Sequence, residues 1–398
     1  MSGRVLAPAG TVVPAGEVLG WLWDAVTRGD ERARLAAAFE SRYGLRRAFL
    51  VSSARAGMSV LLRAMGERVP GRREVAMPGY TCYSVAASAI RAGYRVRPLD
   101  VDSTTLDLAP DALAAAPLDQ ALALIATSLY GLPADLPALE AAARAAGAQL
   151  VDDAAQCLHG RIGDRWVGTF GDAGLYSFDK GKNLTSIQGG VIATSDADLA
   201  ERLARACAAL PEPPARETLM LSAKMLAYAV LLRPSLYGLA TRMATLGETP
   251  FELEAPTTRF PRRLVSLVRR QFDRLDGITA ERQRRAETLR ALLADVPGIS
   301  VPGRAGTTAV YPRLALVFDD PARRDAARAA LVAAGIGATG SYPRALIDVP
   351  GIGPHLAEGT RDTPRARAVA AGILTLPTHE HVTELDLERV ACIVQSIR

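Results

Sequence analysis

The feature that most constrains the fold is an alternation of short apolar segments with helical stretches between about residues 48 and 200. The apolar segments have strand length and carry few charges, which is typical of strands buried on both faces. They lie at residues 48–51, 75–77, 94–101, 121–128, 149–152, 174–178 and 190–194. Helical stretches separate several of them, at 84–92 and 136–146, and a helix at 30–44 should end at Gly44. The alternation predicts an α/β fold with a mostly parallel sheet covered by helices on both faces.

The rest of the chain has a different organisation. A helix is expected at 197–208 and a long charged helical region at 261–295. A strand at 313–318 and helices at 322–334 and 384–397 follow. We therefore predict a large domain at residues 1–255 and a smaller C-terminal α/β domain at 256–398.

An apolar insertion interrupts this plan at about residues 215–250. Its longest uncharged run, 225–232, is far shorter than the ~18–20 residues that a membrane span needs, and Arg233 and Pro234 follow it. We predict helices around Pro234 that border the functional cleft and bury Leu226, Leu231 and Leu236 against a second copy of the chain. A peripheral membrane contact is the less favoured alternative.

Charge and cysteine spacing exclude several classes of function. The net charge of +5 comes from scattered arginines rather than a basic block, which argues against a nucleic-acid partner. Four cysteines without a CxxC motif suggest a reduced cytoplasm without structural zinc. His379 and His381 have no apparent third ligand, so no metal site is predicted and both are expected to be exposed in a loop. The N-terminus lacks the pattern of a signal peptide, and a cytoplasmic protein is expected.

Lysine usage points to a reactive group. Only three of the 47 basic residues are lysines, Lys180, Lys182 and Lys224. A desolvated lysine can lose its proton and attack a carbonyl to form a Schiff base, whereas a guanidinium stays protonated. Lys224, alone in the apolar segment, is interpreted as a lysine that remains by chance in an arginine-rich chain and has no special role. The pair at 180 and 182 is read as functional because of its neighbours.

Acidic residues end one predicted strand at Asp152 and Asp153, where open parallel sheets place their ligands. The small-residue turn at 52–57 opens a predicted helix, and with Ser177 it can supply donors to a phosphate. A pyridoxal-phosphate site needs at least two groups, a lysine that forms an imine and a carboxylate that keeps the ring nitrogen protonated. The combination therefore indicates a pyridoxal-phosphate site.

These motifs, in this order, resemble the DegT/DnrJ/EryC1/StrS family of sugar aminotransferases over most of the chain. Residues 152–156 (D-D-A-A-Q) resemble the family's E-D-A-A-Q, and residues 167–174 resemble its V-G-S-F-G-D-A-G. The stretch from Ser177 to Leu184 is similar to S-F-x-x-x-K-x-L, and Gln188-Gly189-Gly190 to the E-G-G that follows. The resemblance implies a fold-type I aminotransferase architecture and a homodimer with shared active sites.

The resemblance also implies a role for each matching residue. Lys182 would be the Schiff-base lysine, since Lys180 falls off the motif, and Asp153 would pair with the pyridinium nitrogen. Gln156 would contact the ring near its phenolic oxygen and Ser177 the phosphate. Ala54 and Arg55 stand in the phosphate turn, where the family has S-G-T.

Several positions depart from the family pattern. Cys82 occupies the place of the aromatic that usually stacks on the ring, so Tyr80 or Tyr83 is expected to stack instead. Thr257 stands where the family has an asparagine that reaches the neighbouring subunit's phosphate, and Ser341-Tyr342-Pro343 replaces H-Y-P. The departures cluster at substrate and subunit contacts.

The resemblance thus implies a pyridoxal-phosphate-dependent aminotransferase that passes an amino group from an amino acid, glutamate in most relatives, to a keto sugar. The sugar is expected to be nucleotide-linked and to serve polysaccharide or natural-product biosynthesis. One alternative is a related enzyme that acts on a non-sugar ketone. The other is a regulatory member without turnover, against which the intact pair of Asp153 and Lys182 argues.

Overall fold

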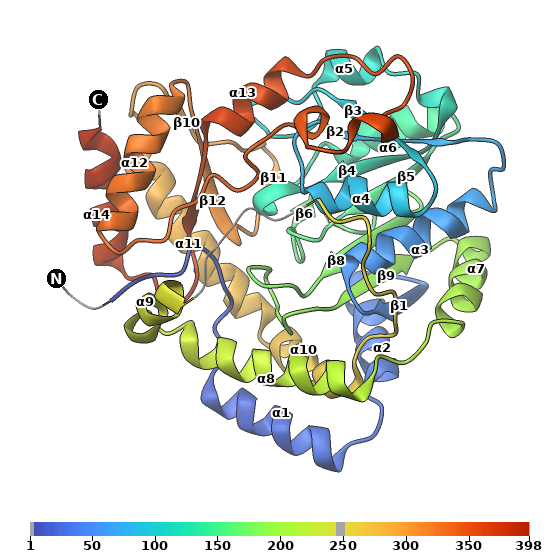
Figure 1. The fold of residues 1–398 in the computed structure, drawn as a ribbon, viewed down its shortest axis with the longest axis horizontal. Helices are drawn as coiled ribbons and strands as arrows, with labels where there is room; N and C mark the ends of the chain where they lie inside the picture. Colours follow the sequence, from blue (N-terminus) through green and yellow to red (C-terminus); the bar gives the residue numbers. More distant parts are fainter. Residues whose placement is uncertain (1–3, 244–250, 398) are drawn as a thin grey trace.

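A seven-stranded sheet forms the centre of the computed structural model, which describes residues 4–243 and 251–397 (Figure 1). Its strands lie in the order β1, β9, β8, β5, β4, β2, β3. Their bounds are β1 Arg47–Val51, β2 Glu74–Pro78, β3 Arg95–Leu99, β4 Ala121–Thr127, β5 Gln149–Asp153, β8 Ala173–Ser177 and β9 Gly190–Thr194. Each strand that the apolar segments predicted is present, within a few residues of its expected bounds.

Most neighbours in this sheet are parallel. The pairs β3–β2, β2–β4, β4–β5 and β5–β8 run parallel, and β9 pairs antiparallel with both β8 and β1. Because these strands run in the same direction, their carboxyl ends all lie at one edge of the sheet, and crossover segments connect them. The expected mostly parallel sheet is therefore confirmed, with an antiparallel β9 and β1 at one side.

Helices cover both faces of the sheet, as predicted. On one face, α3 (Ala54–Gly66), α4 (Tyr83–Arg91) and α7 (Ala197–Ala208) share a buried apolar cluster with the strands. On the other, α2 (Arg32–Tyr43), α6 (Leu136–Ala145) and α10 (Arg262–Asp273) do the same. From Ala123 to Ala126 the side chains of β4 alternate between the two clusters, because successive residues of a strand point to opposite faces.

Glycine ends the helix that the sequence placed at 30–44. Helix α2 stops at Tyr43, and Gly44 follows with a φ of 63°, a left-handed conformation that costs glycine little. The predicted end of this helix is confirmed.

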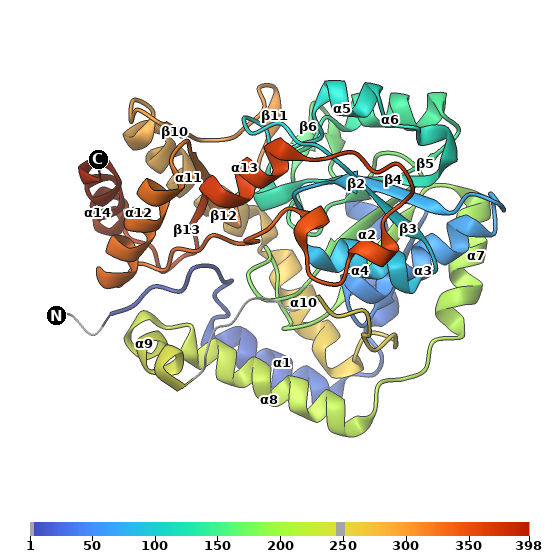
Figure 2. The same cartoon turned by 45° about the horizontal axis from the view of Figure 1, so that its top comes forward.

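A second, three-stranded sheet lies beside the first and has its own apolar core (Figure 2). Its strands are β10 (Ile299–Ser300), β12 (Arg313–Phe318) and β13 (Ile373–Pro377), all antiparallel. Helices α11 (Leu275–Leu293), α12 (Pro321–Ala333), α13 (Pro364–Gly372) and α14 (Glu384–Ser396) pack around it. The helix α10 that precedes them buries Leu264, Val265 and Phe272 in the core of the large sheet. The division into domains at 1–255 and 256–398 stays a prediction.

Short elements connect the two sheets. A small sheet contains β6 (Arg161–Ile162), β7 (Arg165–Trp166) and β11 (Thr307–Thr308), and α5 (Pro110–Ala114) follows β3. Because β11 pairs with β6, the strand before β12 is held against the loop that follows β5.

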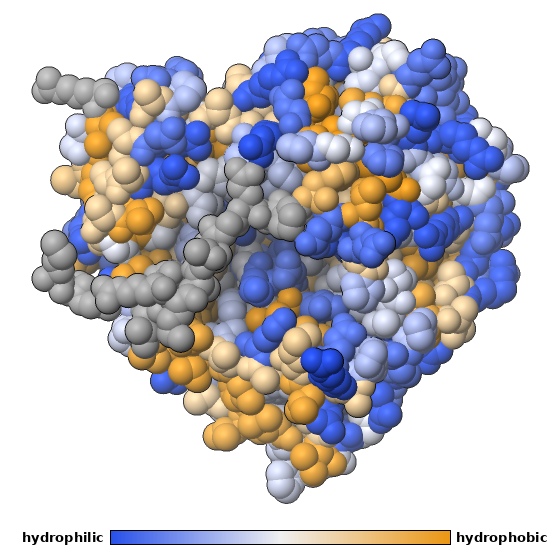
Figure 3. Space-filling view, in the orientation of Figure 1, coloured by the Kyte–Doolittle hydropathy of each residue, from blue (hydrophilic) through white to orange (hydrophobic). Residues whose placement is uncertain are grey.

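Over residues 215–243 the apolar insertion folds as two helices, the second of which begins at Pro234, as predicted, and residues 244–250 of the insertion lie outside the described part of the chain. Helix α8 (Ala215–Leu231) lies beside α1 (Ala15–Thr27), and α9 (Pro234–Met243) follows. Apolar side chains gather along this edge of the molecule (Figure 3). In the single chain Leu226 and Leu231 are each 36% exposed and Leu236 is half-buried, and their burial against a second copy stays a prediction. No helix among residues 4–243 and 251–397 is long and apolar enough to cross a membrane.

Candidate active site

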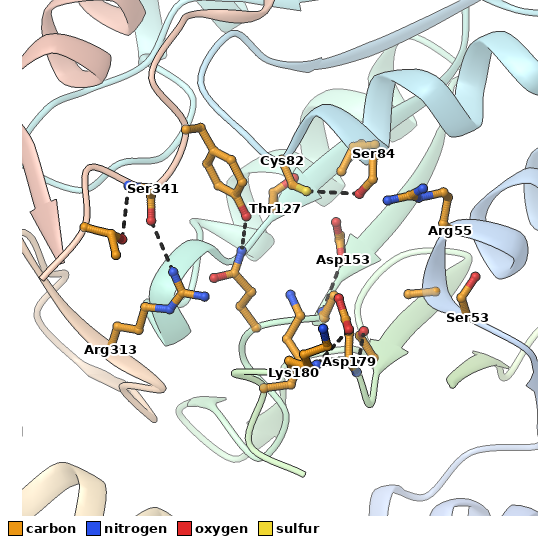
Figure 4. A pocket seen from close by; sticks show the side chains of 18 of the residues that line it. Ser53, Arg55, Cys82, Ser84, Thr127, Asp153, Asp179, Lys180, Arg313 and Ser341 are labelled. Atoms are coloured by element: carbon orange, nitrogen blue, oxygen red, sulfur yellow. Dashed lines mark hydrogen bonds between the residues drawn. The ribbon is translucent and has the colours of Figure 1, made fainter. Parts of the chain in front are cut away.

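A cleft of about 980 Å³ opens at the carboxyl ends of β4, β5 and β8 (Figure 4). The large sheet and the start of α3 form one part of its wall, and Arg313 of β12, helix α12 and residues 338–343 form the other. The structure brings six of the predicted residues to this cleft: Ala54, Arg55, Asp153, Gln156, Ser177 and Lys182. Tyr237 of α9 also lines it, which confirms that the apolar insertion borders the cleft.

The two acidic residues at the end of β5 face different surroundings. Asp153 lines the cleft, and its Oδ1 accepts a hydrogen bond from Ala155 N at 3.1 Å. Burial raises the pKa of Asp153 to about 6, although the nearby Lys182 ammonium opposes this shift. Asp152 turns away from the cleft, and its Oδ2 accepts hydrogen bonds from the backbone N–H groups of Gly168 and Phe170 at 2.5 and 3.3 Å. Burial raises the pKa of Asp152 further, to about 8.

The loop at 166–170 presses on β8 at Gly174. A Cβ at this position would lie 1.9 Å from the carbonyl oxygen of Gly168, so no side chain fits. Gly174 pairs with Asp152 in the sheet. The loop that binds Asp152 is therefore held directly on the strand that ends at Ser177.

Lys182 lies on the loop between β8 and β9 and is half-buried. The hydroxyl of Thr11 donates to its backbone carbonyl at 2.5 Å, and the side-chain amide of Asn183 donates to Leu158 O at 3.0 Å, so this loop is fixed on both sides. Burial lowers the pKa of Lys182, which favours the neutral amine that can attack a carbonyl. Lys180 is exposed.

The start of α3 supplies backbone donors to the opposite end of the cleft. Ser53 caps the helix, since its Oγ accepts from Ala56 N at 3.0 Å. The N–H groups of Ala54 and Arg55 belong to the first turn, where a helix offers no internal acceptor. A Cβ on Gly190 would lie 2.6 Å from Ala54 N, so the strand β9 approaches the helix as closely as a glycine allows. Such a turn is suited to a phosphate.

Gln156 and Arg55 are oriented by neighbours from other segments. The amide of Gln156 accepts from Tyr130 N and donates to Tyr342 Oη, both at 3.3 Å. Arg55 Nη1 lies 3.8 Å from a carboxylate oxygen of Glu252. Ala255 and Pro256, just before Thr257, line the cleft near this end.

Tyr80 and Tyr83, the two candidates for stacking on the ring, do not line the cleft. The hydroxyl of Tyr80 lies 3.0 Å from that of Tyr130, and the Tyr83 hydroxyl accepts from Arg344 N at 2.9 Å. Both rings pack on Tyr342, which does line the cleft together with Cys82. The stacking role proposed for Tyr80 or Tyr83 stays a prediction.

Sequence reasoning did not single out Tyr342 or Arg313 as site residues. Ser341-Tyr342-Pro343 was noted only as a departure from H-Y-P, although its aromatic position could have been taken as a contact. Arg313 begins a predicted strand, and no local pattern distinguishes it from the other arginines. Its place in the cleft follows from the packing of β12 beside the loop that carries Lys182.

The expectation of exposed histidines is wrong for His379. Its side chain is buried, its Nε2 lies 2.9 Å from Ala7 O, and burial lowers its pKa to about 3. The N-terminal segment covers this histidine, and a contact across so many residues leaves no trace in the local sequence.

Comparison with known proteins gives a family match over nearly the whole chain. The family model described as the DegT/DnrJ/EryC1/StrS aminotransferase family matches residues 20–246 and 254–395. DesV of S. venezuelae is 26% identical, covers 96% of this chain and 92% of its own, and has a TM-score of 0.73. DesI, solved in the presence of its TDP-sugar product, is 21% identical, with coverages of 99% and 93% and a TM-score of 0.78. A 3-amino-5-hydroxybenzoic acid synthase is 22% identical, with coverages of 99% and 99% and a TM-score of 0.77.

Proposed function

The chain belongs to the DegT/DnrJ/EryC1/StrS aminotransferase family, whose members depend on pyridoxal phosphate, and on this premise we propose the reaction and the residues that perform it. The protein transfers an amino group from an amino acid, with glutamate as the donor, to a keto sugar that is linked to a nucleotide. It acts as a homodimer in the cytoplasm. The domains at 1–255 and 256–398 form the two walls of its cleft.

One observation carries this proposal. A lysine whose pKa is lowered by burial and a carboxylate at the end of a parallel strand line the same cleft. Lys182 comes from the loop between β8 and β9 and Asp153 from the end of β5, and these two groups are what pyridoxal phosphate requires of a protein.

The residues of the cleft fit this cofactor. The close approach of Gly190 to Ala54 leaves a cradle at the start of α3 that a side chain would fill. Ala54 and Arg55, with the hydroxyl of Ser177, would hold the phosphate there. Asp153 would bind the ring nitrogen, Gln156 would lie by the phenolic oxygen, and Lys182 would bind the cofactor covalently.

Bound pyridoxal phosphate supplies an electron sink for the carbon that loses its proton. Asp153, with a pKa of about 6, is ionised at neutral pH and would keep the ring nitrogen protonated. Lys182 Nζ, whose pKa burial lowers, would serve as the general base that takes up the proton from the donor's α-carbon. Gln156, fixed between Tyr130 and Tyr342, orients the ring edge.

The choice of a keto sugar is supported by relatives such as DesI, solved with its TDP-sugar product. A non-sugar ketone is the second candidate, since an aminohydroxybenzoic acid synthase has the same fold and Ser341 and Thr257 depart from the family pattern. The test is to convert the purified protein to its pyridoxamine form and mix it with nucleotide-linked keto sugars and with cyclic non-sugar ketones.

Return of the pyridoxal spectrum with keto sugars alone supports the proposal. Return with non-sugar ketones alone would replace it with the second candidate. A protein that binds the cofactor and reacts with no donor would be a regulatory member of the family. Sedimentation equilibrium of the same preparation tests the homodimer.

A further inference from the structure

Arg313 occupies the wall of the cleft opposite the start of α3 (Figure 4). It is the first residue of β12, and its side chain is half-buried. A Cβ built on Gly181 would lie 3.2 Å from Arg313 Nη2, so the guanidinium rests against the residue that precedes Lys182. Its positive charge opposes protonation of Lys182 and helps lower the pKa of that amine, although burial is the main cause.

Among the described residues Arg313 forms no ion pair. Its side chain donates one hydrogen bond, from Nη1 to Ser341 Oγ at 3.4 Å. The two other arginines of this wall differ, since Arg324 and Arg328 lie 3.2 and 3.7 Å from carboxylate oxygens of Asp325. A guanidinium is always charged and presents a planar set of donors that matches a carboxylate. Arg313 is therefore a cation of the cleft that no carboxylate of residues 4–243 and 251–397 neutralises.

Ser341 is held in a conformation that supports this arginine. Its φ is 51°, in the left-handed region that non-glycine residues rarely adopt. Its backbone N–H donates to Thr339 Oγ1 at 3.3 Å, and Thr339 Oγ1 lies 3.1 Å from Thr375 Oγ1 on β13. The strained residue thus rests on the three-stranded sheet, and its hydroxyl faces the guanidinium (Figure 4). Strain of this kind is frequent where a protein binds a ligand.

We propose that Arg313 and Ser341 form a carboxylate subsite that binds the α-carboxylate of the amino donor. This inference rests on the proposed function. The phosphate end of the cleft lies at Ala54 and Arg55, and the reacting amine lies at Lys182. A carboxylate on the carbon that carries the amine then faces the wall next to Lys182, which is the wall of Arg313. A keto sugar has no carboxylate beside its carbonyl, so this subsite recognises the donor and not the acceptor.

The test follows the donor half of the reaction in a single turnover, as loss of the pyridoxal spectrum. L-Glutamate is compared with its α-carboxamide, which keeps the amine and the side chain and lacks the charge. Arg313→Gln should weaken the apparent affinity for glutamate on the order of 10- to 100-fold, the effect of losing a hydrogen bond to a charged group. Its reaction with the carboxamide should be unchanged. Arg313→Lys should recover part of the loss, and Arg328→Gln, which changes an exposed arginine that Asp325 already pairs, should behave as the wild type.

Equal losses with glutamate and with the carboxamide would overturn the subsite and leave Arg313 a structural role. A loss confined to the ketone half of the reaction would overturn it too, because the anion would then belong to the acceptor. Calorimetric binding of glutarate, which cannot react, gives a readout without turnover. Equal glutarate affinity in the wild type and in Arg313→Gln contradicts the subsite, whatever the reaction. Glutarate binding that depends on Arg313, in a protein that transfers no amine, would keep the subsite and refute the proposed function.

Discussion

Asp152 and Asp153 are adjacent at the end of β5, yet their carboxylates lie on opposite sides of the backbone. Asp153 lines the cleft, whereas Asp152 binds the backbone N–H groups of the 166–170 loop. Consecutive residues of a strand point to opposite faces, so one aspartate serves the site and the other the scaffold. The relationship assigns different consequences to two substitutions that the sequence alone does not distinguish.

Asp153→Asn should bind pyridoxal phosphate and lose most of its turnover. An amide cannot hold the ring nitrogen protonated, and removing one such electrostatic contact costs on the order of 10² or more in rate. Steady-state amino transfer and cofactor affinity, measured on the same preparation, check this. Asp152→Asn is the control and should keep most of its activity. If Asp153→Asn instead kept more activity than Asp152→Asn, Asp152 would be the partner of the ring nitrogen.

The pH dependence of stability should identify Asp152. Burial raises its pKa from 3.8 to about 8, so between these values the folded protein holds a proton that the unfolded chain has lost. The free energy of unfolding contributed by this group therefore decreases as the pH rises through this window, and it is constant above it. In Asp152→Asn the amide oxygen still accepts from Gly168 and Phe170 but does not titrate. Its Tm should fall less than that of the wild type between pH 6 and pH 8, and parallel Tm profiles would contradict the assignment.

Borohydride reduction of the holoenzyme should fix the cofactor on Lys182. Peptide mapping checks the position, and label on Lys180 would show the assignment to be wrong. Lys182→Arg should keep the positive charge and abolish amino transfer, because a guanidinium forms no imine. Lys180→Arg is the matched control, since this exposed side chain is two residues away, and it should retain activity.

Gly174→Ala should destabilise the fold by more than about 3 kcal/mol, or prevent folding, because the new methyl group would overlap the carbonyl oxygen of Gly168. Gly277→Ala in α11 has no atom within 4 Å of the added carbon. It should raise the stability by about 0.5–1 kcal/mol, the usual gain of alanine over glycine in a helix. The Tm values of both variants, measured by calorimetry, test the expected loss of stability in Gly174→Ala and the expected gain in Gly277→Ala. A normal Tm for Gly174→Ala would mean that the loop at 166–170 can move away from β8.

The strands of the large sheet could be predicted because each is a short apolar run between helical stretches. The residues expected to bind the cofactor could be placed in one site because their motifs lie at or just after the ends of these strands. The position of Tyr80 and Tyr83 outside the cleft lining could not be predicted, since their hydroxyl partners, Tyr130 and Arg344, lie far away in the sequence. The two-residue strands β6, β7 and β11 are too short to show a period. Arg313 reaches the cleft only through the packing of two sheets.

The cleft has walls that belong to separate hydrogen-bonded units. Asp153 and Ser177 end strands of the seven-stranded sheet, whereas Arg313 and Ser341 depend on the three-stranded sheet and its own core. The walls touch through a few side chains, such as Gln156, which donates to Tyr342 Oη, and a substitution on the second wall away from these contacts should leave the strands of the first wall unchanged. The substrate range of such an enzyme can therefore diverge while its reaction centre is conserved, and this independence makes the architecture readily evolvable.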